Sequence, residues 1–346
     1  MRMNPLGRTG EQISELCLGT MTYSTQTPTA DAHAQIDMAL DHGINILDTA
    51  EMYPVNPVRV ETAGNSEKIV GEWLTKTGRR DDILIATKIS GAGSMIRDGV
   101  PITSTEIAKT VEASLKRLQT DMIDLYQLHW PNRGSYMFRQ NWSFDPSKQK
   151  KSDTIAHIAD VLGEMQRLVD AGKIRHIGLS NESAWGTTQF VNAAGAGKGP
   201  RVASVQNEYS LLCRLFDTDM AEMSHNEDVG LLAFSPLATG FLTGKYSGGA
   251  MPDASRMTLN PKMGGRASAR VGAAADAYVA IAQKHGLHPV HMALAWCRTR
   301  PFMASAIIGA TNVDQLKIAL GSVDVTLSDE VLADIDKAHR AHPMPY

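Results

Sequence analysis

Cysteine is scarce in this sequence, with three residues among 346. Their odd number and wide spacing argue against a disulfide framework and against a thiolate metal site, so we interpret Cys17, Cys213 and Cys297 as small buried apolar residues. Long apolar runs are absent as well. No stretch is long enough to cross a bilayer, and the first residues lack the apolar core of a signal peptide. These absences predict a cytoplasmic protein without a membrane partner.

A surplus of charge of one sign is also missing. The chain has 34 Lys and Arg against 37 Asp and Glu, a net charge of −3. Without a global basic field we expect a small-molecule partner and no nucleic acid. The hydrophobic content of 43% can build a large core, and the length suits one α/β barrel. We expect a single domain over residues 1–346 and leave the oligomeric state open.

The glycine fingerprint of a doubly wound dinucleotide-binding sheet is not present. That fingerprint is Gly-x-Gly-x-x-Gly between an early strand and its helix. The glycine-rich runs at 91–93 and 195–199 lack the final spacing and do not open a helix after the first strand. We interpret both runs as loops.

What the sequence does contain is a regular alternation of β-type and helix-type segments. Apolar runs without alternation, such as residues 83–86, are typical of parallel strands that are covered on both faces. A segment with hairpin-like turns precedes them, and a helix-type run over 328–339 follows them. The pattern predicts a (β/α)8 TIM barrel with an N-terminal hairpin and an extra C-terminal helix. The eight candidate strands cover residues 16–20, 44–48, 83–88, 122–129, 174–180, 202–206, 229–235 and 304–309.

Helix starts carry capping signals. Thr103 with Glu106 predicts the start of one helix, and Thr311 or Asn312 with Gln315 predicts another. Three histidines at 285, 288 and 291 have a spacing that a metal site could use. Pro289 separates two of them and no carboxylate accompanies them, so we interpret this segment as a helix boundary.

Polar side chains end three consecutive predicted strands. They are Asp48, Lys88 and His129, and Tyr53 follows the first strand after five residues. Active sites of α/β barrels lie at the carboxyl ends of the strands. We therefore predict that Asp48, Tyr53, Lys88 and His129 form a catalytic group.

The four residue types suit proton donation from a phenol. A free tyrosine has a pKa of about 10 and holds its proton tightly. An ammonium about 4 Å away favours the phenolate by roughly two to three pKa units at an effective dielectric near 20, and Lys88 is its natural source. Asp48 would keep the lysine charged, and a neutral His129 would orient a substrate carbonyl towards Tyr53.

Two long connections draw functional interest because loops of this length are uncommon. Residues 131–152 carry four aromatic residues and predict a loop that covers the substrate. Residues 244–272 carry Lys245, Arg256, Arg266 and Arg270 among many glycines, a composition that could fold over phosphates.

The motifs around the four polar residues resemble those of the aldo-keto reductases. These motifs are Asp48-Thr49-Ala50-Glu51-Met52-Tyr53, Ala86-Thr87-Lys88 and Gln127-Leu128-His129-Trp130. The resemblance covers nearly the whole chain and points to the branch of bacterial Tas-type proteins and potassium-channel beta subunits. It implies a barrel that binds an extended nicotinamide dinucleotide, NADP (NADPH) with NAD possible. It also implies hydride transfer to a carbonyl carbon while Tyr53 protonates the oxygen.

The same resemblance implies a set of cofactor-binding residues. Ser180, Asn181 and Gln206 match residues that hold the nicotinamide carboxamide, and Phe234 matches the aromatic residue that stacks on the nicotinamide ring. The pyrophosphate segment corresponds to Ser235, Pro236, Leu237, Gly240, Lys245 and Arg256, and the adenosine 2′-phosphate site to Gly309, Thr311 and Gln315. Ile318 and Ala319 depart from the family pattern, which often has an acidic residue and an asparagine there.

Three functions are compatible with this pattern. The leading hypothesis is an NADPH-dependent oxidoreductase that reduces aldehydes or ketones to alcohols. The alternative is a nicotinamide-cofactor-binding regulatory or auxiliary subunit with little turnover. The third is net oxidation of an alcohol or sugar by the same site. The sequence does not specify the substrate.

Overall fold

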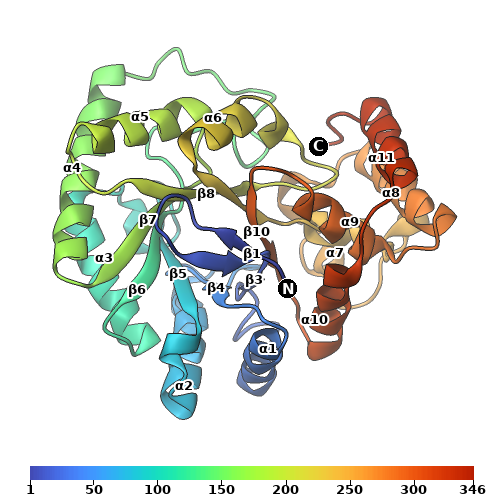
Figure 1. Ribbon diagram of the computed structural model, residues 1–346, viewed down its shortest axis with the longest axis horizontal. Helices are drawn as coiled ribbons and strands as arrows, with labels where there is room; N and C mark the ends of the chain where they lie inside the picture. The colour runs from blue at the N-terminus through green and yellow to red at the C-terminus, as the bar shows by residue number, and fades with distance from the viewer.

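The computed structural model describes residues 1–346 and contains a closed barrel of eight parallel strands (Figure 1). The strands are hydrogen-bonded in the order β10-β3-β4-β5-β6-β7-β8-β9. The predicted (β/α)8 barrel is therefore confirmed, and each predicted strand is found with shifts of no more than two residues at its ends. The strand bounds are β3 Leu16–Gly19, β4 Ile46–Asp48, β5 Leu84–Ile89, β6 Ile123–Leu128, β7 Ile174–Ser180, β8 Val202–Glu208, β9 Gly230–Phe234 and β10 Met303–Ile308.

Helices surround the barrel and cover the outer face of its strands (Figure 1). None of them is long and apolar enough to span a bilayer. Their bounds are α1 Thr29–Asp41, α2 Asn65–Thr77, α3 Ser104–Leu118, α4 Lys151–Asp170, α5 Ala184–Gly195, α6 Asp219–Glu227, α7 Arg256–Leu259, α8 Val271–Lys284, α9 Pro289–Arg298, α10 Val313–Leu320 and α11 Asp329–Ala341.

The predicted helix starts are confirmed. The Thr103 side chain accepts a hydrogen bond from the Glu106 amide at the start of α3, and Asn312 accepts one from the Gln315 amide at the start of α10. His288 caps α9, whose first residue is Pro289, so a helix boundary does separate the three histidines. The predicted final helix is α11, and it packs against α8.

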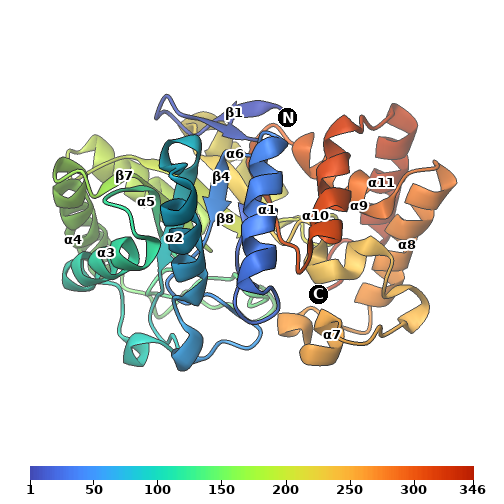
Figure 2. The same ribbon diagram turned by 90° about the horizontal axis from the view of Figure 1, so that it is seen from below.

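An antiparallel hairpin closes the amino end of the barrel. It pairs β1 Met3–Pro5 with β2 Gln12–Ser14, as the turns in the opening segment predict. Leu6 and Ile13 from this segment join the small cluster of side chains inside the barrel. Figure 2 shows the hairpin and α7 at opposite ends of the molecule.

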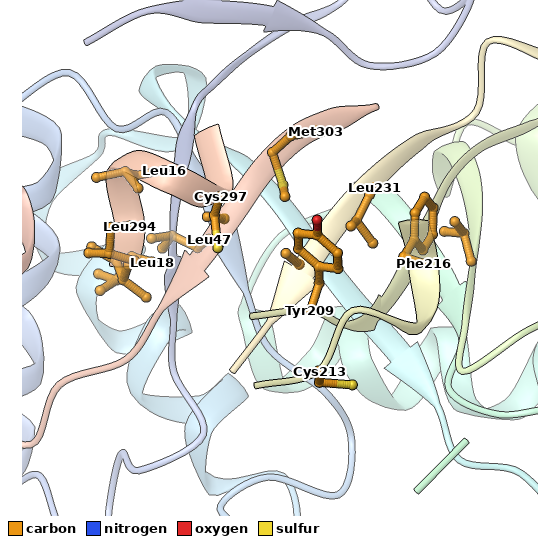
Figure 3. Packing of buried hydrophobic residues seen from close by; sticks show 14 of the residues in the cluster. Leu16, Leu18, Leu47, Tyr209, Cys213, Phe216, Leu231, Leu294, Cys297 and Met303 are labelled. Carbon is orange, nitrogen blue, oxygen red and sulfur yellow. The ribbon is translucent and has the colours of Figure 1, made fainter. Parts of the chain in front are cut away.

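The strand pleat decides which side chains enter the barrel. Successive side chains of a strand point to opposite faces. Ile46 belongs to the interior cluster and Leu47 to the outer core of 74 residues. Figure 3 shows part of this outer core, where Tyr209 lies beside Leu231 and Met303. All three cysteines are buried, as predicted.

Candidate active site

An ion pair between Asp48 and Lys88 lies at the carboxyl end of the barrel interior. Asp48 is on the face of β4 that Ile46 shares, and Lys88 is on the face of β5 that Ala86 shares, so the pleat directs both inwards. The Lys88 Nζ lies 2.8 Å from each carboxylate oxygen of Asp48 and donates to the Thr49 carbonyl at 2.7 Å. The lysine side chain is completely buried. The Asp48 carboxylate and the Thr49 carbonyl thus fix the orientation of the Lys88 ammonium group.

Tyr53 and His129 complete the group. The Lys88 Nζ lies 3.5 Å from the Tyr53 hydroxyl oxygen and 4.9 Å from the centre of its ring. The rings of Tyr53 and His129 meet edge to face with centroids 5.9 Å apart. Gln206 donates to the Asp48 carboxylate at 2.7 Å and fixes it from the opposite side. The structure therefore brings together the four residues that the strand ends single out.

Burial modifies the expected electrostatics. Burial raises the pKa of the Tyr53 phenol, and the Lys88 ammonium offsets only part of that rise. The sequence-based expectation of a net lowered tyrosine pKa is wrong in direction for the free protein, because it omitted desolvation of the phenolate. Burial also opposes the charge of Lys88, but Asp48 and Tyr53 raise its pKa above the ordinary value. Burial and Lys88 hold the pKa of His129 well below its usual range, so this ring is neutral at neutral pH.

A cavity of about 720 Å³ opens over these side chains. Asp48, Tyr53 and His129 line it, while Lys88 lies beneath its wall. All of the residues predicted to bind the cofactor line the same cavity: Ser180, Asn181, Gln206, Phe234, Ser235, Pro236, Leu237, Gly240, Lys245, Arg256, Gly309, Thr311 and Gln315. A volume of this size can hold a dinucleotide and a small substrate.

One part of the cavity has a free acceptor that suits a carboxamide. Asn181 adopts a left-handed backbone conformation with φ of 54°. Its amide nitrogen donates to the His129 carbonyl at 2.9 Å, and its Oδ1 atom is buried without a hydrogen-bond partner. Ser180 donates to the Gln206 carbonyl at 2.8 Å. A buried amide oxygen without a donor is costly, so Asn181 fits a ligand that brings an N–H group.

A second part of the cavity is cationic. Neither Lys245 nor Arg256 has a carboxylate within 4 Å. Burial, and then neighbouring Arg266, lower the pKa of Arg256. Lys245 is exposed and Arg256 is partly buried. A partly buried cation without a counter-ion is typical of a site for an anionic ligand, and phosphate is the common one.

The start of α10 is less open than the sequence indicated. The Gln315 amide is already bonded to Asn312, and the Thr311 amide and hydroxyl both donate to the Gln315 side chain. The N–H groups of Val313 and Asp314 have no acceptor in the protein. Ile318 lines this end of the cavity and is 42% exposed. An anion here would therefore meet fewer free amides than an uncapped helix offers.

Sequence reasoning missed the groups that join the two long connections. Glu208, the last residue of β8, accepts hydrogen bonds from Arg139 in the first connection and from Arg266 in the second. Of the aromatic residues in the first connection only Phe138 lines the cavity, and Trp142 is 59% exposed. The arginines in these loops were the only sequence feature that indicated a buried carboxylate partner. Glu208 lies in a buried strand, and its sequence position did not indicate which arginines it would bind.

The fold is a parallel barrel with a charged site at its carboxyl end, and comparison with known proteins places it among the oxidoreductases. Residues 15–340 match the model of the Aldo/keto reductase family, and the chain belongs to this family. The resemblance seen in the sequence motifs is thereby confirmed.

Individual relatives cover almost the full length. Protein tas of Escherichia coli is 44% identical over 100% of this chain and 99% of its own. The uncharacterized oxidoreductase YrpG of Bacillus subtilis is 30% identical over 96% and 94%. A probable voltage-gated potassium channel subunit beta of Arabidopsis thaliana is 30% identical over 99% and 98%.

Proposed function

We propose that this protein is an NADPH-dependent reductase of aldehydes or ketones, acting in the cytoplasm as a single domain. The observation that carries the proposal is the Asp48–Lys88–Tyr53 arrangement, in which a buried ammonium faces a phenol at 3.5 Å beside a large cavity. NADPH, when bound, supplies the hydride. The residues of the chain bind the partners and deliver the proton.

Each residue of the group has a separate task. A substrate carbonyl oxygen between Tyr53 and His129 would accept hydrogen bonds from the phenol and from the neutral imidazole. As negative charge develops on that oxygen, the Tyr53 proton moves to it and Lys88 stabilises the phenolate that remains. Asp48 keeps the lysine charged and oriented, and Gln206 keeps Asp48 in place.

The choice of NADPH rests on the resemblance of Gly309, Thr311 and Gln315 to an adenosine 2′-phosphate site, and two unpaired cations, Arg256 and Lys245, add to it. Both line the cavity without a carboxylate partner. Three phosphate groups would supply more compensating negative charge than the two of NADH. Direct titration of both cofactors should give a lower dissociation constant for NADPH.

The Tyr53→Phe variant tests the proton donor. We expect turnover with a panel of aldehydes to fall by about 10² to 10⁴-fold, while the cofactor dissociation constant stays within a few-fold, because only the hydroxyl is lost. Nicotinamide absorbance and cofactor fluorescence measure the two quantities.

Tyr278→Phe is the matched control. It removes a buried hydroxyl that has no hydrogen-bond partner and belongs to α8, away from the cavity lining. Its turnover should equal that of the wild type. Equal turnover of Tyr53→Phe and wild type would reject Tyr53 as the donor.

The similarity to a potassium channel beta subunit supports one alternative, a cofactor-binding auxiliary subunit. This function requires a protein partner whose affinity changes when NADPH is exchanged for NADP⁺. Slow turnover of every carbonyl together with such redox-dependent co-purification would favour it. Fast turnover by the isolated protein would favour the reductase.

A further inference from the structure

Two arginines share a single carboxylate at the carboxyl end of β8. Glu208 accepts from Arg266 Nε at 2.6 Å, from Arg139 Nη1 at 2.8 Å and from the Tyr346 hydroxyl at 3.1 Å. No other carboxylate lies within 4 Å of either guanidinium. Burial opposes the charge of Glu208, but the two arginines lower its pKa, so it is ionised at neutral pH. The side chains of this Glu208 cluster, formed by Glu208, Arg139, Arg266 and Tyr346, therefore carry one surplus positive charge.

The surplus charge borders the catalytic half of the cavity. Both arginines line the cavity, and Glu208 pairs in register with Phe234 of β9. Gln206, which holds Asp48, is two residues before Glu208 on the same face of β8. Arg266 also reaches the Ser235 hydroxyl, at 3.5 Å.

Arg139 is also connected to the ring of His129 through a series of aromatic contacts. Its neighbour Phe138 meets the ring of Trp130 edge to face at 6.0 Å, and Trp130 lies 5.0 Å from the ring of His129. Two aromatic side chains thus connect Arg139 to His129, and all four residues line the same cavity.

Arg139 has unused capacity to bind an anion. Its Nε atom is buried without a hydrogen-bond partner, although its side chain as a whole is 16% exposed. Burial and neighbouring Arg266 lower its pKa, which means that a second anion would stabilise its charged form. Arg266, by contrast, is occupied by Glu208, the Met263 carbonyl and Ser235. A guanidinium fork matches the two oxygens of a carboxylate.

We propose that the preferred substrates are carbonyl compounds that also carry a carboxylate, and that Arg139 binds this carboxylate. The inference rests on the proposed reductase function and adds its substrate class. Arg139 is then a specificity-determining residue, and the cations Lys245 and Arg256 remain for the cofactor phosphates.

The test compares acids with their neutral esters. Purified full-length protein is assayed with NADPH and with 3- and 4-carboxybenzaldehyde, each against its methyl ester. The ester group withdraws more electron density than the carboxylate, so intrinsic reactivity favours the ester. We expect the wild type to prefer at least one acid by about tenfold or more in kcat/KM, the size of one charge-assisted hydrogen bond.

In Arg139→Gln this acid-to-ester ratio should fall by about tenfold or more, mainly through KM, and Arg139→Lys should recover part of it. Arg133→Gln is the matched control, because Arg133 lies in the same connection and pairs with a buried carboxylate, Glu182, outside this cavity. It should keep the wild-type ratio.

Several outcomes would overturn the inference. One is a wild type that reduces both esters as well as the acids, which leaves the reductase function intact. Another is an Arg139→Gln variant with an unchanged ratio and a raised NADPH dissociation constant, which would assign Arg139 to a cofactor phosphate. If the wild type reduces neither acids, esters nor any aldehyde of a broad panel, the proposed function itself fails.

Discussion

At the scale of single residues, the site depends on two charges that are both removed from water. Lys88 is fully buried, and Asp48 is 4% exposed in its side chain. Removing one partner of such a pair leaves an uncompensated buried charge, which costs more than the pair itself contributes. The same contact that orients the ammonium towards Tyr53 is therefore needed for stability.

Lys88→Met should lower the free energy of unfolding by about 3 to 5 kcal/mol as well as reduce turnover. The double variant Asp48→Asn/Lys88→Met should recover part of the lost stability but none of the activity, because no charge is then left unpaired. Denaturant unfolding measures the first quantity. A double variant less stable than Lys88→Met would show that the pair is not electrostatically coupled.

The pH dependence of carbonyl reduction also belongs to this scale. The lowered pKa of His129 keeps it neutral above about pH 6.5, and the raised pKa of Tyr53 keeps it protonated beyond about pH 10. Both groups are then in their working forms between these limits. We expect kcat/KM to stay flat from about pH 7 to pH 9. A decline centred near pH 7 that disappears in His129→Gln would contradict a neutral histidine.

At the scale of elements, the helices must approach one another closely enough to cover the barrel. Gly71 of α2 faces the end of α3, where an added Cβ would lie 2.4 Å from the Arg117 carbonyl oxygen. Gly163 of α4 faces open space, with nothing within 4 Å of an added Cβ. The two glycines therefore have opposite effects. Gly71 permits a close contact between the backbones of α2 and α3, whereas Gly163 only lowers the stability of α4.

Gly71→Ala should destabilise the protein by about 1 to 3 kcal/mol, because the backbone of α3 must move. Gly163→Ala, the matched control, should stabilise it by about 0.5 to 1 kcal/mol, since alanine restricts the unfolded chain. Thermal or denaturant unfolding distinguishes the two signs. Equal effects from both substitutions would mean that the α2–α3 contact is unimportant.

At the scale of the whole molecule, cofactor binding should be linked to folding, because the cavity is lined from several strands and both long connections. At a concentration of NADPH 100 times its dissociation constant, the gain is about 2.7 kcal/mol. We expect a rise of a few degrees in the thermal midpoint. Arg256→Gln should require more NADPH for the same rise. An unchanged midpoint at millimolar NADPH would exclude tight binding to the folded state.

Most of the strand and cap assignments could be predicted from sequence because the causes are local. Apolar runs, the Thr103 cap and the Asn312 cap each depend on residues within one turn or strand. The gathering of Asp48, Lys88 and His129 also followed, since parallel neighbours end at the same edge. The Glu208 cluster could not be predicted, because its members are separated by up to 207 residues: Arg139 to Tyr346 is 346 − 139.

The sequence by itself determined the barrel, its order of strands and helices, and the four polar residues at its mouth, because periodicity and strand ends are encoded in short segments. Tertiary structure alone decided how those charges behave. It surrounded the partly buried Tyr53 closely enough for desolvation to raise its pKa, occupied part of the α10 amides, and placed Arg139 and Arg266 on one carboxylate. Desolvation and long-range pairing depend on what surrounds a group in space, and the order of residues along the chain does not specify those surroundings.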